Sequence, residues 1–138
     1  MNAPYDGSKR IAEWFDDDRA QARLQVIYHD RLISHLKQTE RLIPSGACVF
    51  SIKPTVVSLY QNRSSFIPPK VFEDDGKFAA GIKKCRYVYA LPFSSPSFNV
   101  PLYPLDRLGS KAKVISTMRM DDSEDAPIVG SLIEIEPE

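Results

Sequence analysis

The sequence predicts an α+β domain in which an N-terminal helical arm, either one kinked helix or two helices, packs on an antiparallel sheet or a small, partly open β-barrel. Ten of the eleven prolines lie at or after Pro44, and only Pro4 precedes it. Because a helix accepts proline only in its first turn, long helices belong before Pro44. After Gly46 the chain changes to short runs rich in valine, isoleucine, phenylalanine and tyrosine, which favour strands.

A single domain accounts for all 138 residues, with the helical arm in residues 8–43 and a β-rich body in residues 46–136. Hydrophobic residues make up 43% of the chain, which is enough for a buried core. No apolar run approaches the roughly 18 residues of a membrane-spanning helix. Residues 1–10 lack the apolar centre of a signal peptide. We therefore expect a cytoplasmic protein with no membrane contact.

The helical arm is predicted to begin at Ser8, a residue type that caps helices well, and its first helix carries Trp14 and Phe15. Three aspartates, residues 16–18, then interrupt the apolar pattern. Aspartate favours helix starts and suits the positive end of the helix dipole. The triplet therefore either starts a second helix or kinks a continuous one.

The second helix of the arm shows one apolar stripe with a spacing of four, formed by Leu24, Tyr28, Leu32 and Leu36. Pro44 and Gly46 are helix breakers and end it. Its two histidines, His29 and His35, are six positions apart, or about 240° around a helix, so they cannot share a metal ion. We expect both histidines to be partly exposed.

Short strands are expected through the rest of the chain, in residues 47–60, 71–82, 85–93, 111–120 and 128–136. Pro54 has no backbone N–H to donate to a neighbouring strand. The strand expected in residues 47–60 is therefore an edge strand, or it is bulged or split at Pro54. The dipeptide of Asp75 and Gly76 indicates a hairpin turn inside the second. Residues 94–104 contain three prolines and are expected to form an irregular loop.

The two cysteines, Cys48 and Cys85, do not make a disulfide framework in a chain of this size. We expect two buried thiols in strands. A disulfide stays open if the two strands are neighbours, because the bond depends on the separation of the Cα atoms.

Charge is unevenly distributed although the chain is formally neutral. Residues 121–138 hold seven acids and no base, whereas residues 53–93 hold seven bases and three acids. The acidic segment is predicted to be a terminal edge strand with its acids toward water, which discourages unwanted strand pairing. The alternative is a free acidic interaction tail.

The basic region also carries aromatic residues, and proteins that bind single-stranded nucleic acid combine these two features. Strand periodicity places Lys83, Tyr87 and Tyr89 on one face, so that the tyrosines form a stacking platform. Lys84 and Arg86 lie on the opposite face. The alternative function is therefore that of a single-stranded nucleic-acid-binding protein of a phage or mobile-element type, for example a single-stranded DNA-binding protein. The competing interpretation is that the tyrosines belong to the core and the lysines are solvated.

We expect no enzymatic activity, because the sequence has no nucleophile elbow, active-cysteine signature, Walker loop or dinucleotide-binding glycine pattern. The acid clusters in residues 16–18 and 73–75 are the residue types of a metal-dependent nuclease, but capping and turn formation explain them better. No metal and no cofactor are expected.

The leading interpretation is a non-enzymatic interaction module that acts through protein–protein contacts and forms a homodimer. The predicted contact residues are Trp14 and Phe15 on the helical arm, together with Phe66 and Lys70 in a proline-rich loop. Exposed aromatic residues mark partner sites, and a paired helical arm would make a dimer.

Overall fold

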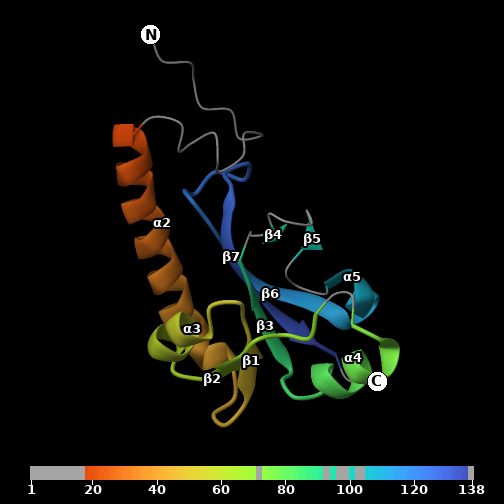
Figure 1. Cartoon of the computed structure of the whole chain (residues 1–138). Helices are drawn as coiled ribbons and strands as arrows, with labels where there is room; N and C mark the ends of the chain where they lie inside the picture. The colour runs from red at the N-terminus through yellow and green to blue at the C-terminus, as the bar shows by residue number, and fades with distance from the viewer. Residues whose placement is uncertain (1–17, 71–72, 92–93, 96–99, 102–104, 137–138) are drawn as a thin grey trace.

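The computed structural model describes residues 18–136, apart from residues 71–72, 92–93, 96–99 and 102–104 (Figure 1). The elements in chain order are helix α2 (Asp18–Thr39), the 3-10 turn η1 (Glu40–Leu42), strand β1 (Cys48–Phe50), helix α3 (Pro54–Gln61), strand β2 (Ser64–Phe66), helix α4 (Asp75–Ile82), strands β3 (Tyr87–Ala90), β4 (Ser94–Ser95) and β5 (Val100–Pro101), helix α5 (Leu105–Leu108), the 3-10 turn η2 (Gly109–Lys111), and strands β6 (Ala112–Arg119) and β7 (Ile128–Ile135).

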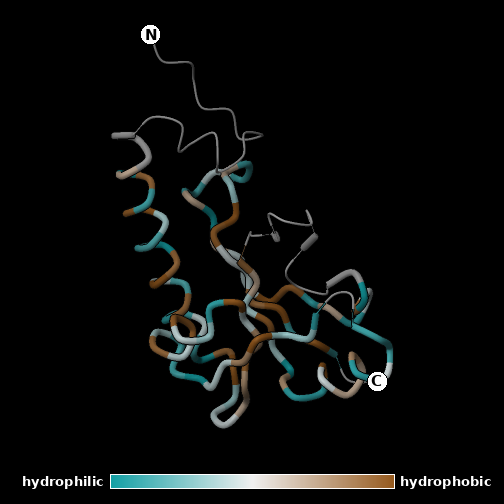
Figure 2. The backbone as a smooth tube through the Cα atoms, in the orientation of Figure 1, coloured by the Kyte–Doolittle hydropathy of each residue, from teal (hydrophilic) through white to brown (hydrophobic). Residues whose placement is uncertain are grey.

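Helix α2 confirms the second helix of the predicted arm. Its apolar stripe is the face that packs inward, since Tyr28, Leu32 and Leu36 are buried in the core. Figure 2 shows apolar and polar residues alternating along this helix, as an amphipathic helix requires. The first predicted helix, with Trp14 and Phe15, lies outside the described residues.

The five-stranded sheet has the order β2-β1-β3-β7-β6 and is open rather than closed into a barrel. Strands β3, β7 and β6 are antiparallel, but β1 runs parallel to both β2 and β3. The α+β class is confirmed, and the expectation of a purely antiparallel sheet is wrong. Parallel neighbouring strands need a crossover connection between them, and helix α3 is that connection between β1 and β2. The sequence pattern predicts a strand where α3 lies.

Two segments predicted as strands are largely helical. In residues 47–60 only β1 is a strand, and Pro54 is the first residue of α3, where its missing N–H costs nothing. In residues 71–82 the chain forms α4 instead of a hairpin. The Asp74 side chain accepts a hydrogen bond from the Lys77 backbone N–H at 2.9 Å and caps this helix.

The last three predicted strands are present as β3, β6 and β7, but β7 lies inside the sheet between β3 and β6. The acidic segment is therefore an ordered strand with a turn before it, and the expectation of an edge strand is wrong. Residues 94–104 were expected to be irregular, yet they contain β4 and β5, which pair with each other.

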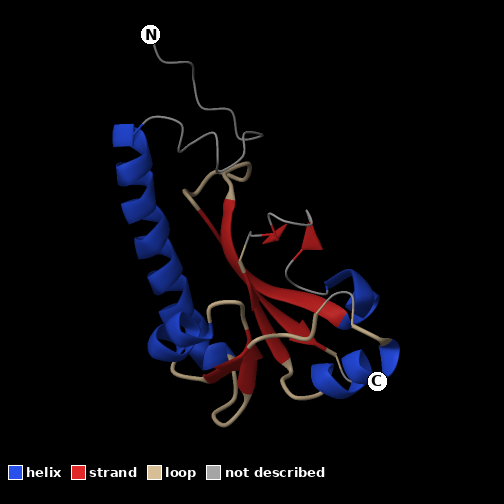
Figure 3. Cartoon of the chain, in the orientation of Figure 1, coloured by secondary structure: helices blue, strands red, loops and turns tan. Residues whose placement is uncertain are grey.

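Helices cover both sides of the sheet. Figure 1 shows α2 and α3 on one side and α4 and α5 on the other, and Figure 3 shows the main sheet as one twisted layer between them. The strands at the centre are the most buried part of the chain: Val49, Val88, Tyr89 and Leu132 are at most 1% exposed. None of the helices in the described ranges has both the length and the apolar character of a bilayer-spanning segment. The cytoplasmic location stays a prediction.

A disulfide joins Cys48, the first residue of β1, to Cys85, two residues before β3. The Cα atoms are 5.0 Å apart, within the range that the bond requires. The expectation of two separate thiols is thus wrong. The prediction failed because β1 and β3 are neighbours in the sheet, and the sequence pattern does not reveal which strands are neighbours.

Candidate functional site

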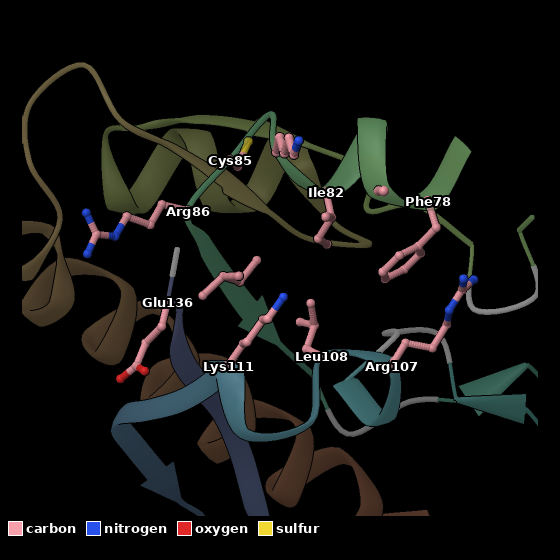
Figure 4. A pocket seen from close by; sticks show the side chains of 11 residues that line it. Phe78, Ile82, Cys85, Arg86, Arg107, Leu108, Lys111 and Glu136 are labelled. Carbon is pink, nitrogen blue, oxygen red and sulfur yellow. The ribbon is translucent and has the colours of Figure 1, made fainter. Parts of the chain in front are cut away.

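A pocket of about 690 Å³ opens beside the sheet, on the side of α4 and α5 (Figure 4). One wall is α4 with the segment that leads into β3, and the other wall is formed by α5, η2 and the end of β7. Its volume lies in the usual range of ligand pockets, roughly 300–1,000 Å³.

The floor of the pocket is apolar. Phe78 and Ile82 come from α4, four positions apart, so they share one face of that helix. Leu108 of α5 and Ile135 of β7 complete the floor from the opposite wall. Phe78 and Leu108 are buried, so this part of the floor belongs to the packed body of the protein. The arrangement offers a site for an apolar group of a ligand.

The rim of the pocket carries the basic residues Lys83, Arg86 and Lys111 and the acidic residue Glu136. Figure 4 shows the Lys111 amine directed into the pocket, close to Ile82 and Leu108. Arg86 already has a carboxylate partner, because its Nε lies 3.3 Å from an oxygen of Glu134. Lys83 is exposed and forms no ion pair with the described carboxylates. The rim therefore favours an anionic group beside the apolar one.

Arg107 holds the two walls together. Its guanidinium donates to the carbonyl of Glu73, two residues before α4, at 2.7 Å and to Asp75 Oδ1, at the first residue of α4, at 2.8 Å. Its central carbon also lies 3.9 Å from the centre of the Phe78 ring, a cation–π distance. The side chain is only 24% exposed. Arg107 therefore positions α5 against α4 and sets the width of the pocket.

The disulfide fixes the segment that carries Lys83 and Arg86. Cys85 lines the pocket and is bonded to Cys48 in the sheet. The backbone N–H of Ile135 donates to the carbonyl of Arg86 at 2.7 Å, which ties the same segment to β7. The pocket walls are thus anchored both covalently and by the sheet.

The structure does not place Tyr87 and Tyr89 on a stacking surface, since they are 5% and 0% exposed. Tyr87 donates to Glu134 at 3.3 Å, and burial, followed by the charge of Glu134, raises the pKa of its hydroxyl. The predicted platform is therefore wrong, and both tyrosines belong to the core. The cause is that β3 is a central strand and that helices cover both faces of the sheet (Figure 1). Periodicity cannot tell such a strand from one with an exposed face.

Other predicted residues are distributed over two surfaces. Lys83 and Arg86 meet at the pocket, whereas Lys84 is not in its lining. Lys84 Nζ lies 3.7 Å above the Phe66 ring, so two residues assigned to different sites from the sequence are in contact. Phe66 ends β2, not a loop as expected, and is 38% exposed; Lys70 is exposed in the loop that follows. Trp14 and Phe15 fall outside the described residues.

His35 is buried, with 1% exposure, and not partly exposed as expected. Its Nδ1 lies 2.7 Å from the Tyr89 hydroxyl and its Nε2 lies 2.8 Å from Ser116 Oγ. Burial lowers the pKa of His35 to about 4. The ring therefore links α2 to β3 and β6 as a neutral hydrogen-bonding group.

Sequence reasoning missed the far wall of the pocket, from Arg107 to Lys111 and from Ile135 to Glu136. Nothing in the sequence connects these segments to α4, because the fold alone brings them together. Only the wall on α4 left a signal in the sequence: the spacing of four between Phe78 and Ile82 indicates one face of a helix.

Within the described part of the chain, no three histidine, cysteine, aspartate or glutamate side chains lie close enough to hold a metal ion. Comparison of the chain with protein-family models, curated proteins and solved structures gives no match.

Proposed function

We propose that the protein is a non-enzymatic interaction module whose pocket binds a segment of a partner protein, an apolar side chain next to a carboxylate. The observation that carries the proposal is the Lys111 amine directed among the apolar side chains of Ile82 and Leu108 (Figure 4). A carboxylate that enters there is partly removed from water, so its attraction to the ammonium is stronger than on an open surface.

An acidic protein segment fits the pocket better than a nucleic acid does. Single strands bind through aromatic faces on which bases stack. The Phe78 ring is covered by Arg107, and Tyr87 and Tyr89 are buried. Two pocket cations also have carboxylate partners, Arg107 with Asp75 and Arg86 with Glu134. A nucleic-acid strand presents a row of phosphates and gains affinity from many cations at once, so these internal ion pairs weaken its binding more than that of a single carboxylate.

Phe66 and Lys70 remain proposed contact residues of the same module. The neighbouring Ile67 is 71% exposed, which supports a role of this loop in contacts with other proteins. Trp14 and Phe15 remain proposed contact residues from the sequence alone.

The test is fluorescence anisotropy with a labelled peptide that has one leucine between glutamates. Lys83→Glu and Lys111→Glu are expected to weaken binding about fivefold or more each, since reversing a charge costs on the order of 1 kcal/mol. Lys37→Glu makes the same charge change on α2, outside the pocket lining, and is expected to change affinity less than twofold.

Binding that persists unchanged in both pocket variants would exclude the pocket as the site. A peptide with lysines in place of the glutamates serves as the charge control. A labelled 30-nucleotide single strand is titrated in parallel. If the strand binds more tightly than the acidic peptide and Lys83→Glu abolishes that binding, nucleic acid replaces protein as the ligand.

A further inference from the structure

The β6–β7 hairpin separates an acidic turn from the basic pocket. Strand β6 starts directly after Lys111 at the pocket rim, and β7 ends at Ile135 in the pocket floor. The turn between the two strands, residues 120–127, lies at the other end of the hairpin (Figure 1). Eight-residue strands at about 3.3 Å per residue place the two ends roughly 26 Å apart. The turn therefore cannot reach the pocket of its own chain.

The turn presents four exposed acids: Asp121, Asp122, Glu124 and Asp125. It is held in place on α2, because Arg31 lies 3.3 Å from Asp122 and donates to the carbonyl of Arg119 at 2.9 Å.

The turn is also internally organised. Asp121 accepts hydrogen bonds from the hydroxyl and the backbone N–H of Ser123, at 2.6 and 2.8 Å. These bonds lower the pKa of Asp121. At the base of the turn Ile128 is 37% exposed. The turn thus offers the acids and an adjacent apolar side chain that the pocket is proposed to bind.

Between the two ends, the hairpin has an exposed apolar centre. Strand β6 is an edge strand of the sheet. Val114 and Ile115, near its middle, are 60% and 36% exposed. The register shift between Val114 and Ser116 marks a bulge, and bulges discourage direct strand pairing. A partner at this edge would therefore contact side chains rather than extend the sheet.

We propose that two copies of the chain form a reciprocal dimer, in which the acidic turn of each copy binds the basic pocket of the other. The proposal rests on the proposed function of the pocket. A twofold axis near the middle of the hairpin makes both charged contacts at once and brings the exposed Val114 and Ile115 of the two copies together. The formal net charge of +0 means that no overall repulsion opposes the association.

Two charge-reversal variants test this dimer by sedimentation velocity at low salt. The turn variant is Glu124→Lys with Asp125→Lys, which spares the Asp121 and Asp122 contacts. The pocket variant is Lys83→Glu with Lys111→Glu. The wild type of 15.6 kDa is expected to sediment at twice that mass and to dissociate near 1 M salt, where the screening length falls to about 3 Å.

Each variant alone is expected to be a monomer. In the turn variant the two new lysines offset Asp121 and Asp122, so the turn has no net negative charge left to attract the basic pocket. In the pocket variant two glutamates face an acidic turn. An equimolar mixture is expected to regain the dimer, since the lysine turn meets the glutamate pocket and the acidic turn meets the wild-type pocket. Val114→Ser tests the apolar centre separately and is expected to raise the dissociation constant about fivefold. Lys37→Glu is the matched control and should leave the mass unchanged.

A wild-type monomer at all concentrations would overturn the dimer, as would a mixture of variants that fails to associate. Species that grow beyond two copies would replace the reciprocal dimer by an open chain. If the wild type is a monomer but still binds the leucine–glutamate peptide, only the dimer fails. If no peptide binds and the pocket variant still dimerises, both proposals fail. Thermal unfolding followed by circular dichroism shows that each variant is folded.

Discussion

The hydroxyl of Tyr89 lies 2.7 Å from Nδ1 of His35, and this pair connects the central strand β3 to helix α2. Ser116 of β6 contacts the other ring nitrogen, so one imidazole joins three elements. A neutral imidazole has one donor and one acceptor, and each is matched here by a hydroxyl group. The protein therefore depends on an uncharged histidine in its core.

Acid is expected to destabilise the protein through His35. Its folded-state pKa of about 4 lies below the usual 6.5, so protonation favours the unfolded chain. Above pH 6.5 the His35 side chain is mostly neutral in both the folded and the unfolded chain. Between pH 6.5 and pH 4 it takes up a proton mainly in the unfolded chain. The free energy of unfolding should fall by about 2 kcal/mol from pH 7 to pH 5. Urea titrations at both pH values measure this difference.

The histidine variants separate His35 from other titrating groups. His35→Gln should remove most of that pH dependence, whereas the exposed His29→Gln should leave it unchanged. Equal pH dependence in His35→Gln and the wild type would contradict this explanation.

Gly130→Ala is expected to destabilise the protein by about 1–3 kcal/mol, as overpacking of a core does. A Cβ atom at this position would lie 2.6 Å from the Tyr89 hydroxyl and 2.8 Å from two ring carbons. Tyr89 must then shift, which disturbs its hydrogen bond with His35. Chemical denaturation measures the loss, and Gly76→Ala in α4 is the control, because its Cβ would meet one carboxylate oxygen at 3.5 Å. A loss of stability no larger than that of the control would show that Tyr89 shifts freely.

Arg107→Ala should lower the free energy of unfolding by about 1–2 kcal/mol and weaken peptide binding, because it removes two hydrogen bonds and the contact with Phe78. Asp75→Ala removes only an exposed ion-pair partner and should have little effect. Urea unfolding and peptide anisotropy measure both variants. Equal effects would mean that the ion pair, rather than the carbonyl and ring contacts, holds the walls together.

Reduction of the Cys48–Cys85 bond should lower the free energy of unfolding by roughly 4 kcal/mol, the loop-entropy value for a separation of 37 residues. Urea titration of the oxidised protein with and without dithiothreitol gives the difference. The double variant Cys48→Ser with Cys85→Ser should be insensitive to the reagent. Wild-type protein that is equally insensitive would show that the two sulfurs are not bonded.

The sequence predicted those elements whose pattern is local and long. The stripe of Leu24, Tyr28, Leu32 and Leu36 extends over more than three turns of α2. Strands β6 and β7 are eight residues long each, which makes them the longest strands of the sheet. Helices α3 and α4 have eight residues each, too few for a clear period. Pro54 and Asp74 are consistent with both a turn and a helix start, so the two helices were mistaken for strands.

The pocket was only half predictable. Lys83 and Arg86 were selected from the sequence because they are close together in a basic run. Arg107 and Lys111 lie more than twenty positions further on, and only the sheet order brings them across from α4. The buried state of Tyr89 depends on the same order. Long-range topology, rather than composition, decides which aromatic residues reach the surface.

The central position of β7 constrains how the chain can fold during synthesis. Among the described strands, β6 pairs only with β7, and β7 is also the antiparallel neighbour of β3. In a nascent chain that ends before Ile128, β6 therefore has no neighbour, and β3 can pair only with the three-residue strand β1. The sheet is therefore complete only after β7 has been synthesised, and earlier folding intermediates expose unpaired strand edges, which favour aggregation.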